Sequence, residues 1–83
     1  MTDTITTRPL YAIAAEIGRD WGKPYFGAVP YLDAMRQLTA ITDPFHYDSG
    51  ESVVRYFLAN ATTWKGDKAR AIKAELKAML KGN

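Results

Sequence analysis

Hydrophobic side chains recur at three- and four-residue intervals along the first quarter of the chain. This spacing predicts a helix over residues 8–21, because an α-helix turns once in about 3.6 residues and collects such positions on one face. Thr7 can cap its start, and Pro9 fits the first turn, where its missing N–H has no helical partner. Gly22 and Pro24 then end the pattern, since proline cannot continue a helix. The apolar face consists of Leu10, Ile13, Ala14, Ile17 and Trp21.

The same spacing predicts two central helices, over residues 28–40 and 49–62, separated by an Asp-Pro pair. Pro30 lies in the first turn of the earlier helix, where proline is tolerated. Asp48 and Glu51 have the spacing of a capping box, with Asp48 as the N-cap of the later helix. The apolar positions are Ala28, Tyr31, Leu32, Met35 and Leu38 in the first helix, and Val53, Val54, Phe57, Leu58 and Ala61 in the second.

Strong helix formers dominate residues 65–81, and Gly82 marks the end of this fourth predicted helix. Its apolar stripe consists of Ala69, Ile72, Leu76, Met79 and Leu80. Four short amphipathic helices joined by short loops must pack their apolar faces against each other. We therefore expect an all-α fold, a compact single domain over residues 8–81 arranged as a bundle or an orthogonal array. Residues 1–7 are expected to form a flexible N-terminal segment.

The composition fits one small globular domain and leaves few catalytic groups. The chain has 83 residues, 47% of them hydrophobic and 24% charged, with no cysteine and a single histidine, His46. Disulfides, thiolate metal sites and cysteine nucleophiles are thereby excluded. Asp43, His46 and Asp48 share one loop, but their spacing matches neither an EF-hand nor a zinc site. His46 could serve as a general base only for Ser49 or Ser52, the nucleophiles near it in the sequence. We expect no enzyme activity, no metal site and no cofactor.

Two further absences bear on where the protein acts. No apolar run approaches the roughly 18 residues that a membrane-spanning helix needs. The first seven residues lack the basic and apolar regions of a secretory signal. We therefore expect a cytoplasmic protein without a membrane partner.

Several segments of the chain carry a resemblance to a known family. They are Arg8-Pro9-Leu10-Tyr11, Asp20-Trp21, Pro30-Tyr31-Leu32-Asp33-Ala34-Met35, Tyr56-Phe57-Leu58-Ala59-Asn60-Ala61, and Thr63-Trp64-Lys65-Gly66 leading into Ile72-Lys73-Ala74-Glu75-Leu76. From Arg8 to Leu80 the chain resembles a family of short uncharacterised proteins encoded by actinobacteriophages and actinobacterial prophages. The resemblance implies a small phage protein that acts in the host bacterial cytoplasm. It implies no activity and no catalytic or ligand residues.

Positive charge collects in the last quarter of the chain. Residues 64–83 carry six basic and two acidic side chains, whereas the rest carries five basic and seven acidic ones. Four of the basic residues fall within one arc of about 80° on the fourth predicted helix, and such a row can follow a phosphate backbone. A solvated helix face explains the same row, because the macrodipole favours lysines near a helix C-terminus. The candidate nucleic-acid contacts are Lys65, Lys68, Arg70, Lys73, Lys77 and Lys81.

Aromatic residues cluster in the predicted connections. Tyrosine and tryptophan are favoured at the centres of protein interfaces, although a small helical domain also uses large side chains to fill its core. Trp21 and Phe57 lie on apolar faces, so we assign them to the core. The loop aromatics are the candidate interface residues, namely Tyr25, Phe26, Phe45 and Tyr47.

These observations favour a small non-enzymatic phage accessory protein that acts as a protein-interaction module. Its partner would be a host factor, a phage factor or a second copy of itself, since a dimer buries apolar surface that a thin core leaves exposed. The alternative is a small nucleic-acid-binding protein. In that case the last two predicted helices, with a tight connection at residues 63–66, would form a helix-turn-helix-like arrangement.

Overall fold

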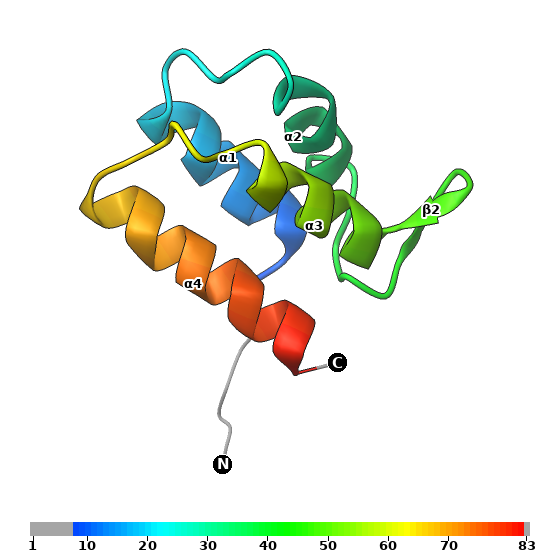
Figure 1. Cartoon of the computed structure of the whole chain (residues 1–83). Helices are drawn as coiled ribbons and strands as arrows, with labels where there is room; N and C mark the ends of the chain where they lie inside the picture. Colours follow the sequence, from blue (N-terminus) through cyan, green and yellow to red (C-terminus); the bar gives the residue numbers. More distant parts are fainter. Residues whose placement is uncertain (1–7, 83) are drawn as a thin grey trace.

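The computed structural model describes residues 8–82 of the chain. Within this range the chain forms four helices and one short hairpin, so the expectation of a mostly helical fold is confirmed (Figure 1). The expectations for residues 1–7, including Thr7 as a helix cap, lie outside the described residues. The elements are α1 (Leu10–Asp20), α2 (Val29–Met35), β1 (Pro44–Phe45), β2 (Asp48–Ser49), α3 (Gly50–Ala59) and α4 (Asp67–Lys81).

Helix α1 begins two residues later than predicted, because Pro9 keeps an extended backbone (φ −65°, ψ 146°) at the N-cap position. No side chain within residues 8–82 caps this end. Instead, the N–H groups of Leu10 and Tyr11 donate to the carbonyls of Thr39 and Leu38, both at 2.9 Å. The first N–H groups of a helix lack partners within it. The loop after α2 therefore caps α1.

Helix α2 ends at Met35, well before the predicted end at residue 40. Beyond it the backbone forms tighter turns, in which N–H groups bond to carbonyls three residues back. The carboxylate of Asp43 accepts hydrogen bonds from the N–H groups of Thr39 and Ala40, at 3.1 and 3.0 Å. A side chain that binds backbone groups in this way competes with the helix for them. The predicted end at residue 40 is therefore wrong, because Asp43 in the following loop binds backbone N–H groups that a longer helix would use.

The loop predicted between the two central helices contains a β-hairpin. Strands β1 and β2 pair antiparallel, with Phe45 opposite Asp48. His46 and Tyr47 form the turn, and His46 has a φ of 56°. A two-residue hairpin turn needs such left-handed backbone, which histidine tolerates better than most residues other than glycine.

Asp48 is a strand residue, so its predicted role as the N-cap of the next helix is wrong. Ser49 caps α3 instead, with its hydroxyl accepting a hydrogen bond from the Ser52 N–H at 3.3 Å. The first residue of α3, Gly50, is buried against the loop after α2. A Cβ atom there would lie 2.7 Å from the carbonyl oxygen of Ala40. Close backbone packing therefore requires glycine at this position.

The connection between α3 and α4 spans residues 60–66, because α3 ends at Ala59 and α4 begins at Asp67. The predicted boundaries at residues 62 and 65, with a tight connection, are therefore wrong. Gly66 precedes α4 with a φ of 111°. A residue with a Cβ atom would be strained in this conformation, whereas glycine adopts it readily. The end of α4 at Lys81, followed by Gly82, agrees with the prediction.

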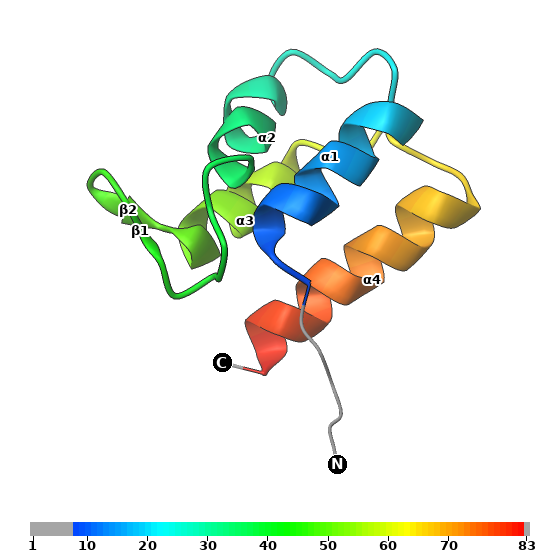
Figure 2. The same cartoon turned by 180° about the vertical axis from the view of Figure 1, so that it is seen from behind.

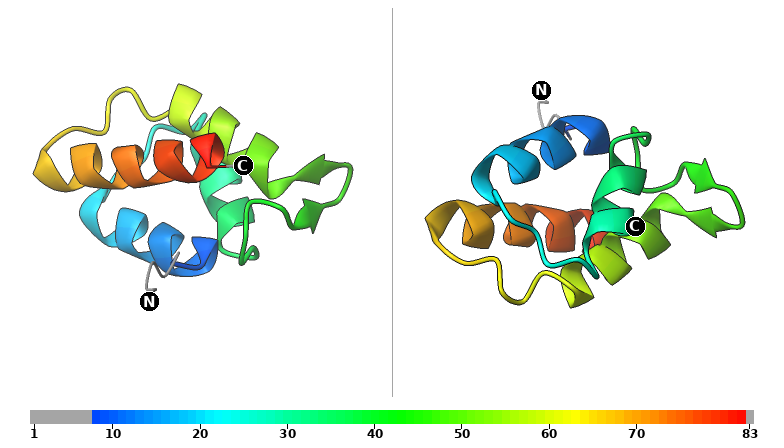
Figure 3. Two further views of the ribbon diagram at one scale, coloured as in Figure 1. Left: turned by 90° about the horizontal axis from the view of Figure 1, so that it is seen from below. Right: turned by 90° about the horizontal axis from the view of Figure 1, so that it is seen from above.

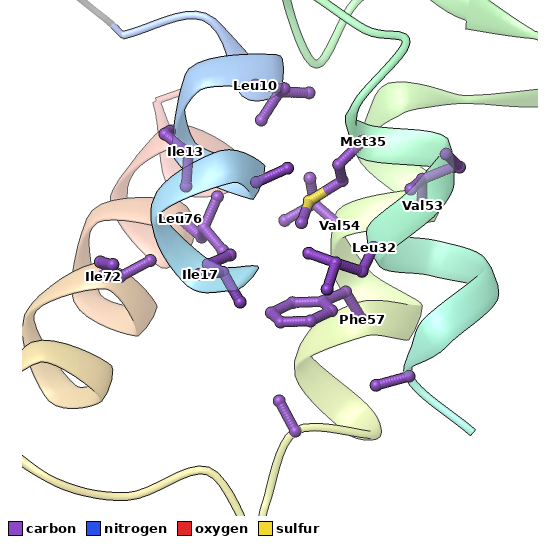
Figure 4. Close-up of a cluster of buried hydrophobic side chains, with 14 of the residues drawn as sticks. Leu10, Ile13, Ile17, Leu32, Met35, Val53, Val54, Phe57, Ile72 and Leu76 are labelled. Carbon is purple, nitrogen blue, oxygen red and sulfur yellow. The ribbon is translucent and has the colours of Figure 1, made fainter. Parts of the chain in front are cut away.

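The apolar faces of the four helices meet in one core (Figure 4). Every position predicted for an apolar face contacts this core. Most of these side chains are buried, and four pack half-buried at the edge of the core, namely Tyr31, Leu58, Met79 and Leu80. The core also contains Ala34, Ile41 and Trp64. The period of 3.6 residues therefore identified the buried faces even where it misplaced the helix ends.

An aromatic cluster anchors the long α3–α4 connection to the core. The ring of Trp64 stacks on Trp21 with centroids 5.7 Å apart, and Phe57 meets each indole edge-on at 6.3 Å. The Trp64 Nε1–H donates to the carboxylate of Asp20 at 2.9 Å. Since only 2% of Trp64 is exposed, the indole serves packing and is closed to an external ligand.

Helices α1 and α4 run side by side in opposite directions, and the hairpin projects from one edge of the helical body (Figures 1, 2 and 3). The radius of gyration is 12.2 Å, close to the value of about 12 Å for a folded domain of this length. None of the helices in residues 8–82 has the length and apolar character to cross a membrane.

Candidate functional site

Exposed aromatic side chains gather where the α1–α2 loop meets α2 and α3. Phe26 is 79% exposed and Tyr25 45% exposed, and their ring centroids lie 4.8 Å apart. Tyr56 of α3 is 52% exposed and stacks on the half-buried Tyr31 of α2 at 5.4 Å. We call these four residues the aromatic surface.

Asn60 joins the two aromatic pairs. Its amide nitrogen donates to the carbonyl of Tyr56 at 2.9 Å. Its amide oxygen lies 2.9 Å from the point where a Cβ atom on Gly27 would stand, and the Tyr25 ring lies 2.5 Å from that point. Tyr25 and Asn60 therefore flank the bare backbone of Gly27. The loop pair therefore lies beside the C-terminal end of α3, about one helical turn after Tyr56.

The other two candidate interface residues lie in the hairpin, away from this surface. Tyr47 projects at the turn and is fully exposed. Phe45 packs against the hydrophobic core and is half-buried. The hairpin stands at an edge of the molecule, whereas the α1–α2 loop runs over the ends of α1 and α2 (Figures 1 and 3). The structure therefore brings Tyr25 and Phe26 together and separates them from Phe45 and Tyr47.

The six candidate basic residues divide between two sides of α4. Helical spacing places Lys68 with Glu75 on the flank that faces α1, and places the others from α4 on the opposite flank. Lys65 joins the second group from the connection that precedes the helix. We call the second group the basic flank; it consists of Lys65, Arg70, Lys73, Lys77 and Lys81.

On the α1 side, Lys68 belongs to a network of four charged side chains. The Arg8 guanidinium donates to both oxygens of Glu75 at 2.9 and 2.6 Å, and to Glu16 at 2.7 Å. The Lys68 ammonium donates to the other oxygen of Glu16 at 3.0 Å. These hydrogen bonds, first from Arg8 and then from Lys68, lower the pKa of Glu16 to about 2. Lys68 is thus paired with an acidic side chain of α1, although its own side chain is half-exposed.

Lys73 is the half-buried member of the basic flank. Its ammonium donates to the carbonyl of Trp64 at 2.6 Å and lies 5.8 Å from the centre of the Trp64 ring. Burial lowers the pKa of Lys73, and the nearby charges of Lys65 and Lys77 lower it further. Arg70 pairs with Asp67 at 3.0 Å, in a contact between two strongly exposed side chains. Such pairs contribute little to stability, so Arg70 stays available to a ligand.

The connection between α3 and α4 differs from that of a helix-turn-helix. It has seven residues, whereas the motif uses a turn of about three to four. Trp64 fixes the segment to Trp21 at the end of α1, and α4 packs along α1 as well as α3. The basic flank is therefore the side of a single helix and its preceding connection, without the geometry of that motif.

Two hollows in the surface are lined by residues outside the aromatic surface. One, about 530 Å³, opens between the start of α1, residues 39–42 and the end of α4. A second, about 340 Å³, lies beside Trp64 and is bordered by Lys65, Arg70 and Lys73.

Within residues 8–82, no three histidine or acidic side chains are grouped to hold a metal ion. Asp43, one of the loop acids, binds the backbone of residues 39 and 40.

Sequence reasoning missed half of the aromatic surface. Tyr31 fell on the apolar face of its predicted helix and Tyr56 beside a connection, so neither was singled out as an interface residue. The available signal was that Tyr56 lies outside the arc defined by Val53, Val54 and Phe57, which predicts an exposed ring. The pairing of Tyr56 with Tyr31 depends on how α2 packs against α3, and one helix pattern contains no such information.

No family model, curated protein or solved structure matches the chain. The function therefore has to be inferred from two features of the molecule, the aromatic surface and the basic flank.

Proposed function

We propose that this protein is a non-enzymatic accessory protein of an actinobacterial phage or prophage, and that it acts as a protein-interaction module in the host cytoplasm. The observation that carries the proposal is the aromatic surface, in which Phe26 is 79% exposed and Tyr56 52% exposed. The phage setting follows from the sequence resemblance alone. The partner is a phage or host protein, or a second copy of the chain.

The aromatic surface has the properties of an interface centre. Tyrosine and other aromatic residues contribute most to binding when a partner excludes water from them. Each ring also carries few rotatable bonds, so little side-chain entropy is lost on binding. The stack of Tyr31 on Tyr56 spans α2 and α3, which holds the rings in place before a partner arrives. Exposed aromatic side chains of this kind are typical of protein-binding sites.

A double substitution tests the proposal with a matched control. Phe26→Ser with Tyr56→Ser removes two rings from the aromatic surface, and Tyr11→Ser with Tyr47→Ser removes two exposed rings from elsewhere. Sedimentation equilibrium first measures self-association of each protein. Capture from actinobacterial lysate, with and without phage infection, then identifies other partners, whose affinities are measured after purification. Urea unfolding shows whether each variant remains folded.

We expect the first variant to weaken dimerisation or partner binding at least tenfold, which corresponds to about 1.4 kcal/mol. The second variant should bind like the wild type. The single variant Phe26→Ser, whose ring is the most exposed of the four, should show a loss of the same direction without a loss of stability. Equal binding by all variants, or a wild type that is strictly monomeric and captures no partner, would refute the proposal.

A further inference from the structure

The basic flank is a row of cations on a part of α4 that the core does not use. Lys73, Lys77 and Lys81 follow one another at four-residue intervals, and this spacing places them about 6 Å apart along one side of the helix. Arg70 lies on the same side, and Lys65 extends the row beyond the helix start. Within residues 8–82, Asp67 is the acidic residue that pairs with this row, whereas Glu75 faces α1 and binds Arg8.

Four of the five charges in the row have no acidic partner in the described part of the chain. Lys65, Lys77 and Lys81 make no hydrogen bond or ion pair with other residues in the described part of the chain, residues 8–82. Lys73 binds a neutral carbonyl and has its pKa lowered by burial and by its two lysine neighbours. Like charges that crowd in this way repel each other in the free protein. An external polyanion would relieve that repulsion.

The surroundings of the row distinguish among polyanions. None of the large hydrophobic side chains exposed in residues 8–82 belongs to α4 or to the connection before it, and Trp64 is 2% exposed. An acidic protein partner would meet no apolar anchor, which protein interfaces usually have at their centre. A single-stranded nucleic acid would find no ring on which to stack its bases. A duplex, which presents its phosphates outward, needs neither.

We propose that the basic flank binds the phosphate backbone of duplex nucleic acid without reading its sequence. Lysines dominate the row, and lysine contributes a flexible point charge, whereas bidentate base recognition usually uses arginine. Binding therefore depends on phosphate contacts and on the counterions that they release. This site uses no residue of the aromatic surface and does not depend on the proposed protein partner.

The test is a titration of labelled duplex DNA of random sequence with the full-length protein. If four of the five cations contact phosphates, affinity should fall about a hundredfold between about 50 and 200 mM salt. The variant with Lys65→Gln, Lys77→Gln and Lys81→Gln removes three exposed cations that have no internal partner within residues 8–82. Its matched control, with Arg19→Gln, Lys23→Gln and Arg55→Gln, removes the same charge from α1, its following loop and α3.

The flank variant should bind at least about tenfold more weakly at low salt, and its salt slope should be reduced by about 0.9 for each phosphate that it no longer neutralises. The control should stay within about threefold of the wild type, because its substitutions lie off the row. Circular dichroism confirms that both variants keep their helices. Absence of binding at 50 mM salt, or equal losses in the two variants, would overturn the proposal.

Two competitors test the class of ligand. Poly-glutamate at the same charge concentration should displace the duplex poorly, and a single strand of the same sequence should bind more weakly than the duplex. Efficient displacement by poly-glutamate would overturn the proposal in favour of an acidic protein partner. A preference for the single strand would contradict the assignment of the duplex.

Discussion

Glycines 50 and 22 differ in what a single added carbon atom would meet. At Gly50 a Cβ atom would lie 2.7 Å from the Ala40 carbonyl oxygen and 2.9 Å from the Ile41 Cα, both rigid backbone atoms. At Gly22 no atom of residues 8–82, other than those of Gly22 and its chain neighbours, lies within 4 Å. The first position tightly joins the start of α3 to the loop after α2, whereas the second only follows α1.

We therefore expect Gly50→Ala to destabilise the protein by about 1–3 kcal/mol, the usual cost of inserting an atom into a packed site. Gly22→Ala should be neutral or stabilising by up to about 1 kcal/mol, because it restricts the unfolded chain. Urea unfolding monitored by tryptophan fluorescence measures both. Similar midpoints for the two variants would contradict the close packing at Gly50.

The start of α3 shows how a neighbouring element changes the role of a residue. The capping-box spacing between Asp48 and Glu51 predicts Asp48 as the N-cap. In the structure Asp48 pairs with Phe45 in the hairpin, which moves the cap to Ser49. The hairpin was not visible in the hydrophobic pattern, since its strands are two residues each.

Ser49→Ala should therefore cost about 1 kcal/mol, the typical loss for removing an N-cap side chain. Asp48→Ala should change the free energy of unfolding by less than about 0.5 kcal/mol, as at other exposed sites. Urea titrations of the two variants, followed by circular dichroism at 222 nm, give this comparison. A larger loss for Asp48→Ala would show that Asp48, and not Ser49, stabilises the start of the helix.

Helix ends in this protein depend on residues distant in sequence. The first N–H groups of α1 bond to carbonyls 38 and 39, and the first two N–H groups of α3 bond to the carbonyls of Asp43 and Ile41. One loop, residues 38–43, thus caps two helices. Periodicity within a helix identified the buried faces because burial depends on the side chains themselves. The ends could not be predicted because their partners come from tertiary packing.

The same distinction applies to the candidate sites. The basic flank was predictable in most of its members, because residues of one helix share a side by spacing alone. Lys68 lies apart from this flank, on the side of α4 that faces α1, where it pairs with Glu16. The aromatic surface combines a loop with two helices, so its other half, Tyr31 and Tyr56, became evident only from the packing of α2 on α3.

At the scale of the whole molecule, the network of Arg8, Glu16, Glu75 and Lys68 ties the two ends of the described chain together. It joins the segment before α1 and the body of α1 to two positions on α4. Residues 8 and 75 are far apart in sequence, and only the folded chain brings them within hydrogen-bond distance. The stability that the network contributes must therefore appear in global unfolding and depend on the charge of its carboxylates.

The sign of that dependence follows from Glu16, whose pKa is lowered to about 2 by the hydrogen bonds from Arg8 and Lys68. A carboxyl group with a lowered pKa in the folded state stabilises the protein above its ordinary pKa of about 4.3, and this stabilisation disappears as pH falls toward 2. Glu16→Gln should therefore lower the melting temperature at pH 7, and its difference from the wild type should shrink between pH 4.5 and pH 2. Melting curves over this range measure the difference.

Glu51→Gln provides the control for this pH dependence. Glu51 pairs with Arg55 at 2.7 Å on the exposed side of α3, within one helix. Such a pair contributes about 0.3–0.5 kcal/mol, so the control should differ little from the wild type at any pH. A constant gap between Glu16→Gln and the wild type from pH 7 to pH 2 would show that shape, and not charge, is what the substitution disturbs. A closing gap would show that the charge pairs between α1 and α4 stabilise the whole fold.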